Sequence, residues 1–325
     1  MIRHFIKPVN LLQAGASYLG SLISHERSLV RGMPVSVSAE LTNNCNLNCP
    51  ECSSGSGLMT RQHGFMDISL FRAVIKELKP YLYNINLYFQ GEPMLHPHFF
   101  SFVESSRGIH STVSTNGHFL SADNAEKLVF SGLSRLIVSL DGADQESYSA
   151  YRINGNFESV LEGLRSVKSA RARHKSSMKL EIQLLVNRIN EHQIPRVRSI
   201  ARSLGALLTL KSMQIIHEDK IGEWLPAENR YSRYEITDSR FVNKNRMPDN
   251  CARLWFNPVI TWDGKVLPCC FDKDAEHIMG DLSQESFREI WNGPRYRVFR
   301  KAILKDRSMI EICRNCSSGL KGVKY

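Results

Sequence analysis

The 325-residue sequence lacks the features that send a chain into or across a membrane. No apolar stretch approaches the roughly 20 residues that a membrane-spanning helix needs. A secretory signal is not expected either, because Pro8, Asn10 and Gln13 interrupt the apolar start and no cleavage-like site follows. Internal repeats and low-complexity segments are also absent. These absences predict a cytoplasmic protein.

Long blocks of like charge are missing, although the net charge is +10. A basic surface attracts nucleic acid, anionic lipid or an acidic substrate. Here the lysines and arginines are scattered and no aromatic run is interleaved with them. We therefore expect a solvated basic surface and no nucleic-acid partner.

Residues 1–32 form a predicted N-terminal extension. Pro8 is expected to begin a helix that continues to about Ser24. Its apolar residues are flanked by Arg3, Lys7 and further arginines. Two interpretations fit this pattern: a helix lying on a membrane surface, and a helix packed on the main domain.

A repeated strand–helix pattern begins at Pro34 and predicts βαβ units around a parallel sheet. Helices are expected between the strands at 68–78, 122–130, 157–171 and 194–204. The expected strands are 35–41, 84–89, 111–115, 136–140, 179–186 and 207–212. Six such units predict an α/β fold, a partial (β/α)6 TIM-like barrel over residues 33–215.

Polar residues alternate with apolar ones on two of these strands. Asn84, Asn86 and Tyr88 share one face of their strand, and Glu181 and Gln183 share one face of theirs. With helices outside, the polar faces would line a lumen that holds a polar ligand. Residues 216–250 are polar with weak periodicity and are interpreted as a linker, whereas residues 251–325 predict a β-hairpin and a helix over about 284–303.

Eight cysteines are many for a chain in a reducing compartment, where they are more often metal ligands than disulfides. Cys45, Cys49 and Cys52 follow the first strand with the spacing Cys-x3-Cys-x2-Cys. Three thiolates on one loop can hold three corners of a [4Fe–4S] cluster and leave the fourth iron open to a reactant. A zinc knuckle is the alternative for such a motif.

This loop resembles the signature of the radical S-adenosylmethionine (SAM) superfamily. The resemblance implies that the open iron binds SAM, and that an electron from the cluster cleaves SAM to methionine and a 5′-deoxyadenosyl radical, which takes a hydrogen atom from a substrate. The superfamily usually has a bulky residue before the third cysteine, near the adenine. Glu51 stands there in this sequence, so the adenine contacts must come from elsewhere.

Motifs at the ends of later strands resemble the SAM-binding segments of the same superfamily. Gly91 and Glu92 stand in a Gly-Glu-Pro segment that would receive the SAM ammonium. Four more polar residues would contact SAM through its methionine part or ribose: Ser114, Asn116, Ser139 and Asp141. Arg152 would pair with a carboxylate. Each motif alone has an ordinary explanation as a turn or a surface residue.

A second cysteine set consists of Cys251, Cys269, Cys313 and Cys316. Four thiolates can complete an auxiliary [4Fe–4S] cluster or a zinc site. The Gly264-x4-Cys269 hairpin resembles the start of the SPASM domain, and the small number of cysteines resembles its shorter "twitch" form with one cluster. The resemblance implies a small C-terminal iron–sulfur domain.

Cys270 and Asp272 follow the hairpin cysteine. Adjacent strand residues face opposite ways, so Cys270 is expected to point away from the cluster that Cys269 binds. Sulfatase-maturing relatives have a catalytic Asp directly after the matching cysteine. Asp272 is the nearest carboxylate here, and it is interpreted either as the base for substrate oxidation or as the residue that ends the hairpin.

Two functional hypotheses follow from these motifs. In the first, the chain is a radical SAM oxidoreductase or maturase that acts on a peptide or sugar-like substrate. It would take electrons from a donor such as flavodoxin or ferredoxin, and the auxiliary cluster would accept an electron from the substrate. In the second, it is a zinc-binding interaction protein with acidic partners.

Overall fold

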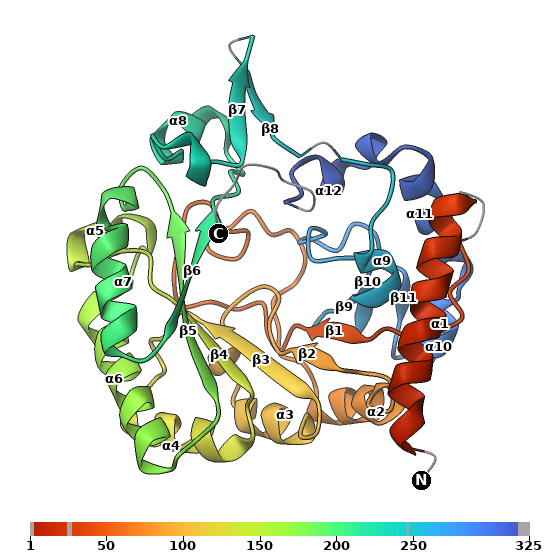
Figure 1. Ribbon diagram of the computed structural model, residues 1–325, viewed down its shortest axis with the longest axis horizontal. Helices are drawn as coiled ribbons and strands as arrows, with labels where there is room; N and C mark the ends of the chain where they lie inside the picture. The colour runs from red at the N-terminus through yellow and green to blue at the C-terminus, as the bar shows by residue number, and fades with distance from the viewer. Residues whose placement is uncertain (1–2, 25–27, 239, 246, 318–325) are drawn as a thin grey trace.

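The computed structural model describes residues 3–24, 28–238, 240–245 and 247–317, and a parallel sheet forms its centre (Figure 1). The strands of this sheet run in the same order in space as in the chain. They are β1 (Ser36–Ala39), β2 (Asn84–Asn86), β3 (His110–Thr115), β4 (Arg135–Ser139), β5 (Lys179–Val186) and β6 (Leu207–Ser212). Each pairs in parallel with the next. The predicted partial barrel is confirmed.

Helices cover the outer face of the sheet, where they surround its curved lower edge in Figure 1. They are α2 (Ile68–Leu78), α3 (Phe99–Ser105), α4 (Ala122–Ser131), α5 (Gln145–Tyr151), α6 (Phe157–Arg173) and α7 (Ile194–Ser203). Asp67 and Asn156 accept hydrogen bonds from the first-turn amides of α2 and α6, which defines where these helices begin. The sequence interpretation missed α3 and α5, each of which has only 7 residues.

The two faces of the sheet differ in polarity because side chains alternate along each strand. Val37, Ile85 and Val113 point to the helices and belong to the hydrophobic core. On the other face, the Asn86 side-chain amide donates a 3.2 Å hydrogen bond to the Ser38 hydroxyl. The expected polar inner face is therefore present. We call the space in front of this face the lumen.

The C-terminal segment continues the same sheet. Strand β9 (Val259–Ile260) pairs in parallel with β1 and antiparallel with β10 (Lys265–Leu267), which pairs with β11 (Gly280–Asp281). The result is one sheet of nine strands with the order β11-β10-β9-β1-β2-β3-β4-β5-β6. The predicted hairpin is correct, but its continuity with the barrel was not anticipated.

Four short helices complete the C-terminal segment: α9 (Arg253–Phe256), α10 (Phe287–Trp291), α11 (Pro294–Lys305) and α12 (Glu311–Arg314). The single helix expected over about 284–303 is wrong, since the chain breaks between α10 and α11 at Gly293, which is extended with ψ 165°. Pro294 disfavours a helical conformation in the residue before it and then begins α11 at its first position.

The region interpreted as a linker is structured. It contains α8 (Ile221–Trp224) and a hairpin of β7 (Tyr234–Thr237) and β8 (Arg240–Asn243), which stands above the barrel in Figure 1. Short 3-10 turns occupy 93–95, 191–193, 218–220, 229–231 and 307–309. The hydrophobic periodicity of residues 216–250 is weak because their helices and strands are short.

Helix α1 (Arg3–Ile23) begins before Pro8, which lies inside it. The helix packs against α9, with the rings of Tyr18 and Trp255 5.4 Å apart, and Asn10 hydrogen-bonds the backbone of Met33 at 2.7 and 2.9 Å. Its opposite face carries apolar side chains that stay in solvent. No helix in the described ranges is both long and apolar enough to cross a membrane.

Arg300 gives a prediction for stability. Its side chain is completely buried between Trp291 and Tyr296, 4.5 Å from each ring, and donates 3.0 Å hydrogen bonds to the carbonyls of Leu254 and Trp291. We expect Arg300→Ala to lower the free energy of unfolding by about 3 kcal/mol, because buried acceptors lose a charged donor. Urea denaturation would measure it.

The control is Arg297→Ala on the exposed side of the same helix, where a change within about 0.5 kcal/mol is expected. Equal effects of the two substitutions would contradict a stabilising role for the buried guanidinium.

Candidate active site

The structure brings most of the predicted SAM-site residues to one cavity at the carboxyl ends of the strands. The loop after β1 supplies three thiols, and the ends of β2, β3 and β4 supply polar groups. The predicted residues that line the cavity are Cys45, Cys49, Cys52, Gly91, Glu92, Ser114, Asn116, Ser139 and Arg152. This is the edge at which barrel enzymes place their active sites.

Burial disfavours the charged form of the thiols in this loop. It raises the pKa of Cys45 and raises the pKa of Cys49 to about 12, with Arg152 opposing the effect at Cys49. A bound metal cluster would offset this cost, since coordination stabilises thiolates. The three thiols therefore suit an iron–sulfur cluster.

Glu92 joins the cysteine loop to the next strands. Its buried carboxylate accepts hydrogen bonds from the backbone amides of Met94 at 3.0 Å and Asn116 at 2.6 Å, and from the Thr115 hydroxyl at 2.7 Å. Its own amide donates to the carbonyl of Asn44 at 2.8 Å. Burial raises the pKa of Glu92, while these donors oppose the rise. The side chain lies at the predicted cavity but also holds its walls together.

Gly91 and Asn116 lie next to the same loop. Gly91 has φ 72°, and an added Cβ would meet the carbonyl oxygens of Thr42 and Asn44 at 2.6 Å, so that only glycine fits. The Asn116 side chain donates to the Asn46 side-chain oxygen at 2.7 Å and lies 4.0 Å from the Cys45 sulfur. Both residues hold the loop in place.

The buried Asp141 and the half-buried Arg152 form an ion pair beside Cys49. The carboxylate receives the guanidinium at 2.6 Å and the backbone amide of Leu185 at 2.6 Å. Arg152 lies 3.7 Å from the Cys49 sulfur. Burial works against its charge, but Asp141 and Cys49 raise the pKa of Arg152 well above its ordinary value. The carboxylate partner of Arg152 is thus Asp141 of the same chain, and Asp141 supports the cavity from behind it.

Glu51 has a structural contact that the sequence did not reveal. Its buried carboxylate accepts hydrogen bonds from the amides of Ile216 at 2.5 Å and His217 at 3.1 Å, just after β6. A bulky residue was expected here on the superfamily pattern. The acid instead ties the first cysteine loop to the far end of the sheet.

The second cysteine set comes from three segments of the C-terminal region, since Cys313 and Cys316 share one. Cys251, Cys269, Cys313 and Cys316 are all buried. Burial raises the pKa of Cys313 to about 11 and that of Cys269 well above its usual value. Two arginines lie near this set. Cys270 and, to a lesser degree, Cys269, Cys251 and Cys316 raise the pKa of Arg253, and Cys251, Cys313 and Cys316 raise that of Arg307 against the effect of burial.

Among the described residues, Glu276, His277 and Glu311 form a group of three whose ligand atoms lie within 4.8 Å of one another. In a cubic cluster each thiolate binds a different iron, whereas on a zinc ion all the thiolates bind one metal.

Arg61 connects the two cysteine regions. Its guanidinium pairs with the buried Glu40 at the end of β1 and donates to the Lys273 carbonyl at 3.1 Å. Its neighbour Thr60 binds the Asp274 carboxylate at 2.8 Å through its amide. The segment after the first cluster loop is therefore joined to the segment after the hairpin cysteines.

Cys270 and Asp272 face different surroundings. Cys270 lies in a turn beyond the end of β10, so strand alternation does not set its direction. It is half-buried, and its thiol acts electrostatically on Tyr88, Lys211 and Arg253. The Asp272 carboxylate accepts hydrogen bonds from the amides of Glu276 at 2.8 Å and His277 at 2.9 Å. These contacts are those of a residue that closes the loop after the hairpin.

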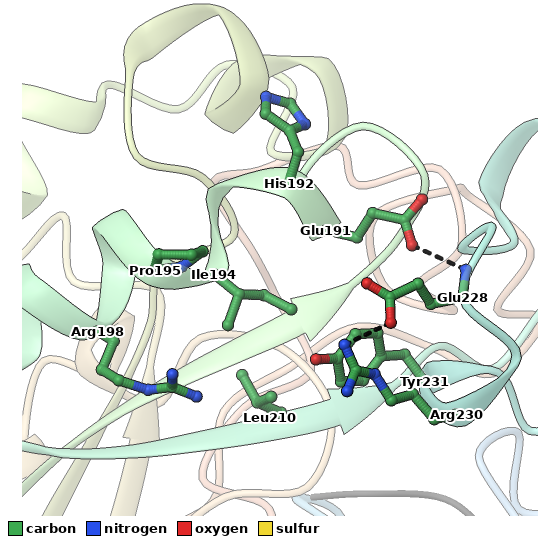
Figure 2. Close-up of a pocket in the computed structure, with 9 residues that line it drawn as sticks. All are labelled: Glu191, His192, Ile194, Pro195, Arg198, Leu210, Glu228, Arg230 and Tyr231. Atoms are coloured by element: carbon green, nitrogen blue, oxygen red, sulfur yellow. Dashed lines mark hydrogen bonds and ion pairs between the residues drawn. The ribbon is translucent and has the colours of Figure 1, made fainter.

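A separate hollow of about 520 Å³ lies on the outer side of β6 (Figure 2). Glu191 there accepts hydrogen bonds from the amides of Ala227 at 2.9 Å and Glu228 at 3.1 Å, and Arg230 pairs with Glu228 at 2.5 Å. Its acidic groups are thus engaged in holding loops, and no cysteine lines it. The cavity at the strand ends remains the candidate active site.

Comparisons with known proteins agree with this geometry. The family model described as "Radical SAM superfamily" matches residues 39–182, and the SPASM model, described as "Iron-sulfur cluster-binding domain", matches residues 251–317. The AdoMet-dependent heme synthase of Methanosarcina barkeri is 24% identical over 306 residues, which are 82% of this chain and 84% of that protein. The PqqA peptide cyclase of Gluconobacter oxydans is 29% identical over 316 residues, 87% of this chain and 82% of that protein.

A solved structure supports the fold. SuiB of Streptococcus suis bound to S-adenosylmethionine superimposes with a TM-score of 0.64 at 13% identity, and the match covers 97% of this chain and 79% of that one. At this identity the likeness concerns the arrangement of strands and helices.

Glu92 gives a prediction for ligand binding. Both carboxylate oxygens of Glu92 accept hydrogen bonds. In Glu92→Gln, an NH2 group replaces one of these oxygens and faces a donor instead of accepting from it, so residues 91–92 and 115–116 of the cavity wall should shift. We expect the affinity for SAM to fall about 10-fold, with iron content unchanged because no metal ligand is touched. Calorimetry under anaerobic conditions measures the affinity.

Glu104→Gln on the exposed surface of α3 is the control with the same chemical change. An unchanged SAM affinity in Glu92→Gln would remove Glu92 from the binding site.

Proposed function

Because the chain belongs to the radical SAM superfamily and carries a C-terminal SPASM iron–sulfur domain, we propose that this enzyme modifies a peptide side chain. Its cofactors are a SAM-binding [4Fe–4S] cluster, SAM and an auxiliary iron–sulfur cluster. When bound and reduced, the first cluster and SAM supply a 5′-deoxyadenosyl radical that abstracts a hydrogen atom.

The observation that carries this proposal is the set of three cysteine thiols in a cavity with no fourth cysteine or histidine among its described lining residues. Such a set leaves one iron available for SAM. Cys45, Cys49 and Cys52 would hold the cluster, and Arg152, kept in place by Asp141, would balance its thiolate charge.

The auxiliary cluster would be held by Cys251, Cys269, Cys313 and Cys316, with Arg253 and Arg307 beside the thiols. We assign Gly91, Glu92, Ser114, Asn116 and Ser139 to the SAM pocket because they line the same cavity as the first cysteines. Asp272 is assigned to loop closure, because its contacts are with backbone amides.

A peptide substrate is supported by the relative named PqqA peptide cyclase, which matches most of this chain. The heme synthase relative makes a small-molecule substrate the second candidate. A flavodoxin or ferredoxin would provide electrons. None of the eight cysteines, all of them among the described residues, forms a disulfide, which suits a reducing compartment.

Cysteine substitutions test the cluster assignment. Replacing Cys45, Cys49 and Cys52 together with Ala should remove one cluster and stop formation of 5′-deoxyadenosine, because no thiolate remains at the cavity. Cys269→Ala should remove the other cluster. Iron counting and chromatography after anaerobic incubation with SAM and a reductant give both results.

Cys270→Ala is the matched control, since Cys270 is the cysteine outside both proposed ligand sets, and it should keep the iron of both clusters. Continued 5′-deoxyadenosine formation in the triple variant, or loss of a cluster in Cys270→Ala, would overturn the assignment.

Helix α1 has the surface expected of a membrane contact. Its protein-facing side holds small or polar residues such as Asn10, Ala14 and Ser21, whereas large apolar side chains face solvent. The most exposed are Phe5 at 69%, Leu12 at 72%, Leu19 at 61% and Ile23 at 86%. The first 25 residues contain no Asp or Glu but do contain Arg3 and Lys7. We propose that this stripe lies on an anionic membrane surface.

A vesicle experiment tests this contact. The double variant Leu12→Glu with Leu19→Glu should lose co-sedimentation with phosphatidylglycerol vesicles, because two charges enter the stripe. Val298→Glu, at an equally exposed apolar position on α11, should bind as the parent does. Absence of parental binding, or concentration-dependent dimers that disappear in the double variant, would reject the membrane in favour of another partner.

A further inference from the structure

Arg152 contacts an acid and a thiol at the same time. Its Nε and Nη2 atoms each lie 2.6 Å from Oδ2 of Asp141. Its third nitrogen, Nη1, donates to the sulfur of Cys49 at 3.7 Å. The guanidinium is planar and holds its donors in a rigid fork, so the ion pair on one edge fixes the direction of the remaining nitrogen. Arg152 is thereby aimed at a sulfur of the first cysteine loop.

Asp141 is itself held firmly in place. Its Oδ1 atom accepts a 2.6 Å hydrogen bond from the backbone amide of Leu185, and its backbone carbonyl accepts one of 3.0 Å from the Asn190 side chain. The residue is completely buried. Both carboxylate oxygens are thus engaged, and Asp141 acts as a positioning residue for Arg152.

The main chain joins the same two segments. The backbone amide of Asn48, next to Cys49, donates to the carbonyl of Ile153, next to Arg152, at 3.1 Å. The Arg152 side chain is 17% exposed. Because little water surrounds the guanidinium, its charge is screened less at the sulfur than it would be at the protein surface.

A second donor approaches the cysteine loop from the end of β3. The Asn116 side-chain amide lies 4.0 Å from the Cys45 sulfur and donates to the Asn46 side-chain oxygen at 2.7 Å. This contact with sulfur is longer than that of Arg152, and the amide carries no net charge. Arg152 is therefore the stronger of the two donors.

These contacts act on the property that decides whether a cluster accepts an electron. The reduction potential of an iron–sulfur cluster depends on its net charge, its solvent exposure and the hydrogen bonds to its sulfur atoms. Accepting one electron adds one negative charge. A cationic donor at a ligand sulfur stabilises the reduced form more than the oxidised form, and so raises the potential.

We propose that Arg152 raises the reduction potential of the SAM-binding cluster by donating a hydrogen bond to the Cys49 thiolate. The electron comes from a donor such as flavodoxin or ferredoxin, which is oxidised as the cluster is reduced. This inference rests on the proposed function and adds to it a residue that acts on the electron-transfer step. Arg152 has this role before any substrate binds.

A potentiometric titration followed by electron paramagnetic resonance tests the inference in the reconstituted enzyme without SAM. Leaving SAM out removes any effect of Arg152 on SAM itself. The signal of the first cluster is the one that the triple variant Cys45→Ala, Cys49→Ala, Cys52→Ala lacks, and the remaining auxiliary signal serves as the reference. We expect Arg152→Met to lower the midpoint potential of the first cluster by about 59 mV, which is a 10-fold change in a one-electron equilibrium.

Two further variants keep the test decisive. Arg152→Lys retains the charge but not the fork that contacts Asp141 and Cys49 together, so its potential should lie between those of Arg152→Met and the parent. Arg173→Met, which removes an equal charge from an exposed ion pair in the last turn of α6, should leave the potential unchanged. Iron content shows whether each variant keeps its clusters, and Arg152→Lys decides the question if Arg152→Met loses iron. A parental potential in either Arg152 variant, or an equal shift in Arg173→Met, overturns the inference.

Formation of 5′-deoxyadenosine by the parent separates the two levels of the argument. If it forms but the Arg152 variants keep the parental potential, the inference fails and the proposed function stands. If the parent forms none, the proposed function fails, whatever the potentials are.

Discussion

Burial of cysteine thiols is the constraint on which the rest of this structure depends. Cys49 has a pKa raised to about 12 by burial, and Cys313 one raised to about 11. A fold that confines thiols in this way gains from a bound cationic metal group and must keep the thiols apart to suit a cluster. The hydrogen bonds of Glu92, Glu51 and Asn116 all act on the first cysteine loop or its neighbours, which explains why so many buried polar side chains lie there.

The parallel sheet provides the positions for these contacts. Each strand ends at the same edge, so groups separated by many residues in the chain meet there without long loops. Asp141 after β4 reaches Arg152 and the amide of Leu185 on β5, and Glu51 reaches the segment after β6. Many of the polar side chains at the cavity bind other side chains or the backbone. Those internal contacts determine which polar atoms remain available to a ligand.

Much of the site could be predicted because its spacing is local. The Cys-x3-Cys-x2-Cys loop and the polar residues at strand ends follow directly from the order of residues, and the alternation along β5 indicated the polar inner face. Long-range contacts could not be predicted in this way. The pairing of β9 with β1, the contact of Glu51 with residues 216–217 and the closure of a loop by Asp272 each join distant segments. The split between α10 and α11 was predictable, since Gly293-Pro294 marks it in the sequence.

Continuity of the sheet fixes the two cysteine sites relative to each other. Because β9 pairs with β1, the strand that precedes the first cysteines and the hairpin that carries Cys269 belong to one rigid layer. Arg61 strengthens the junction by joining Glu40 to the backbone of Lys273. Cys269, whose pKa burial raises well above its usual value, follows this hairpin, and Cys270 after it lies in a turn and not in an extended strand. The hairpin that precedes Cys269 is therefore positioned by β1, the strand that leads into the first cysteine loop. A change in the β1–β9 pairing should alter both cysteine sites together.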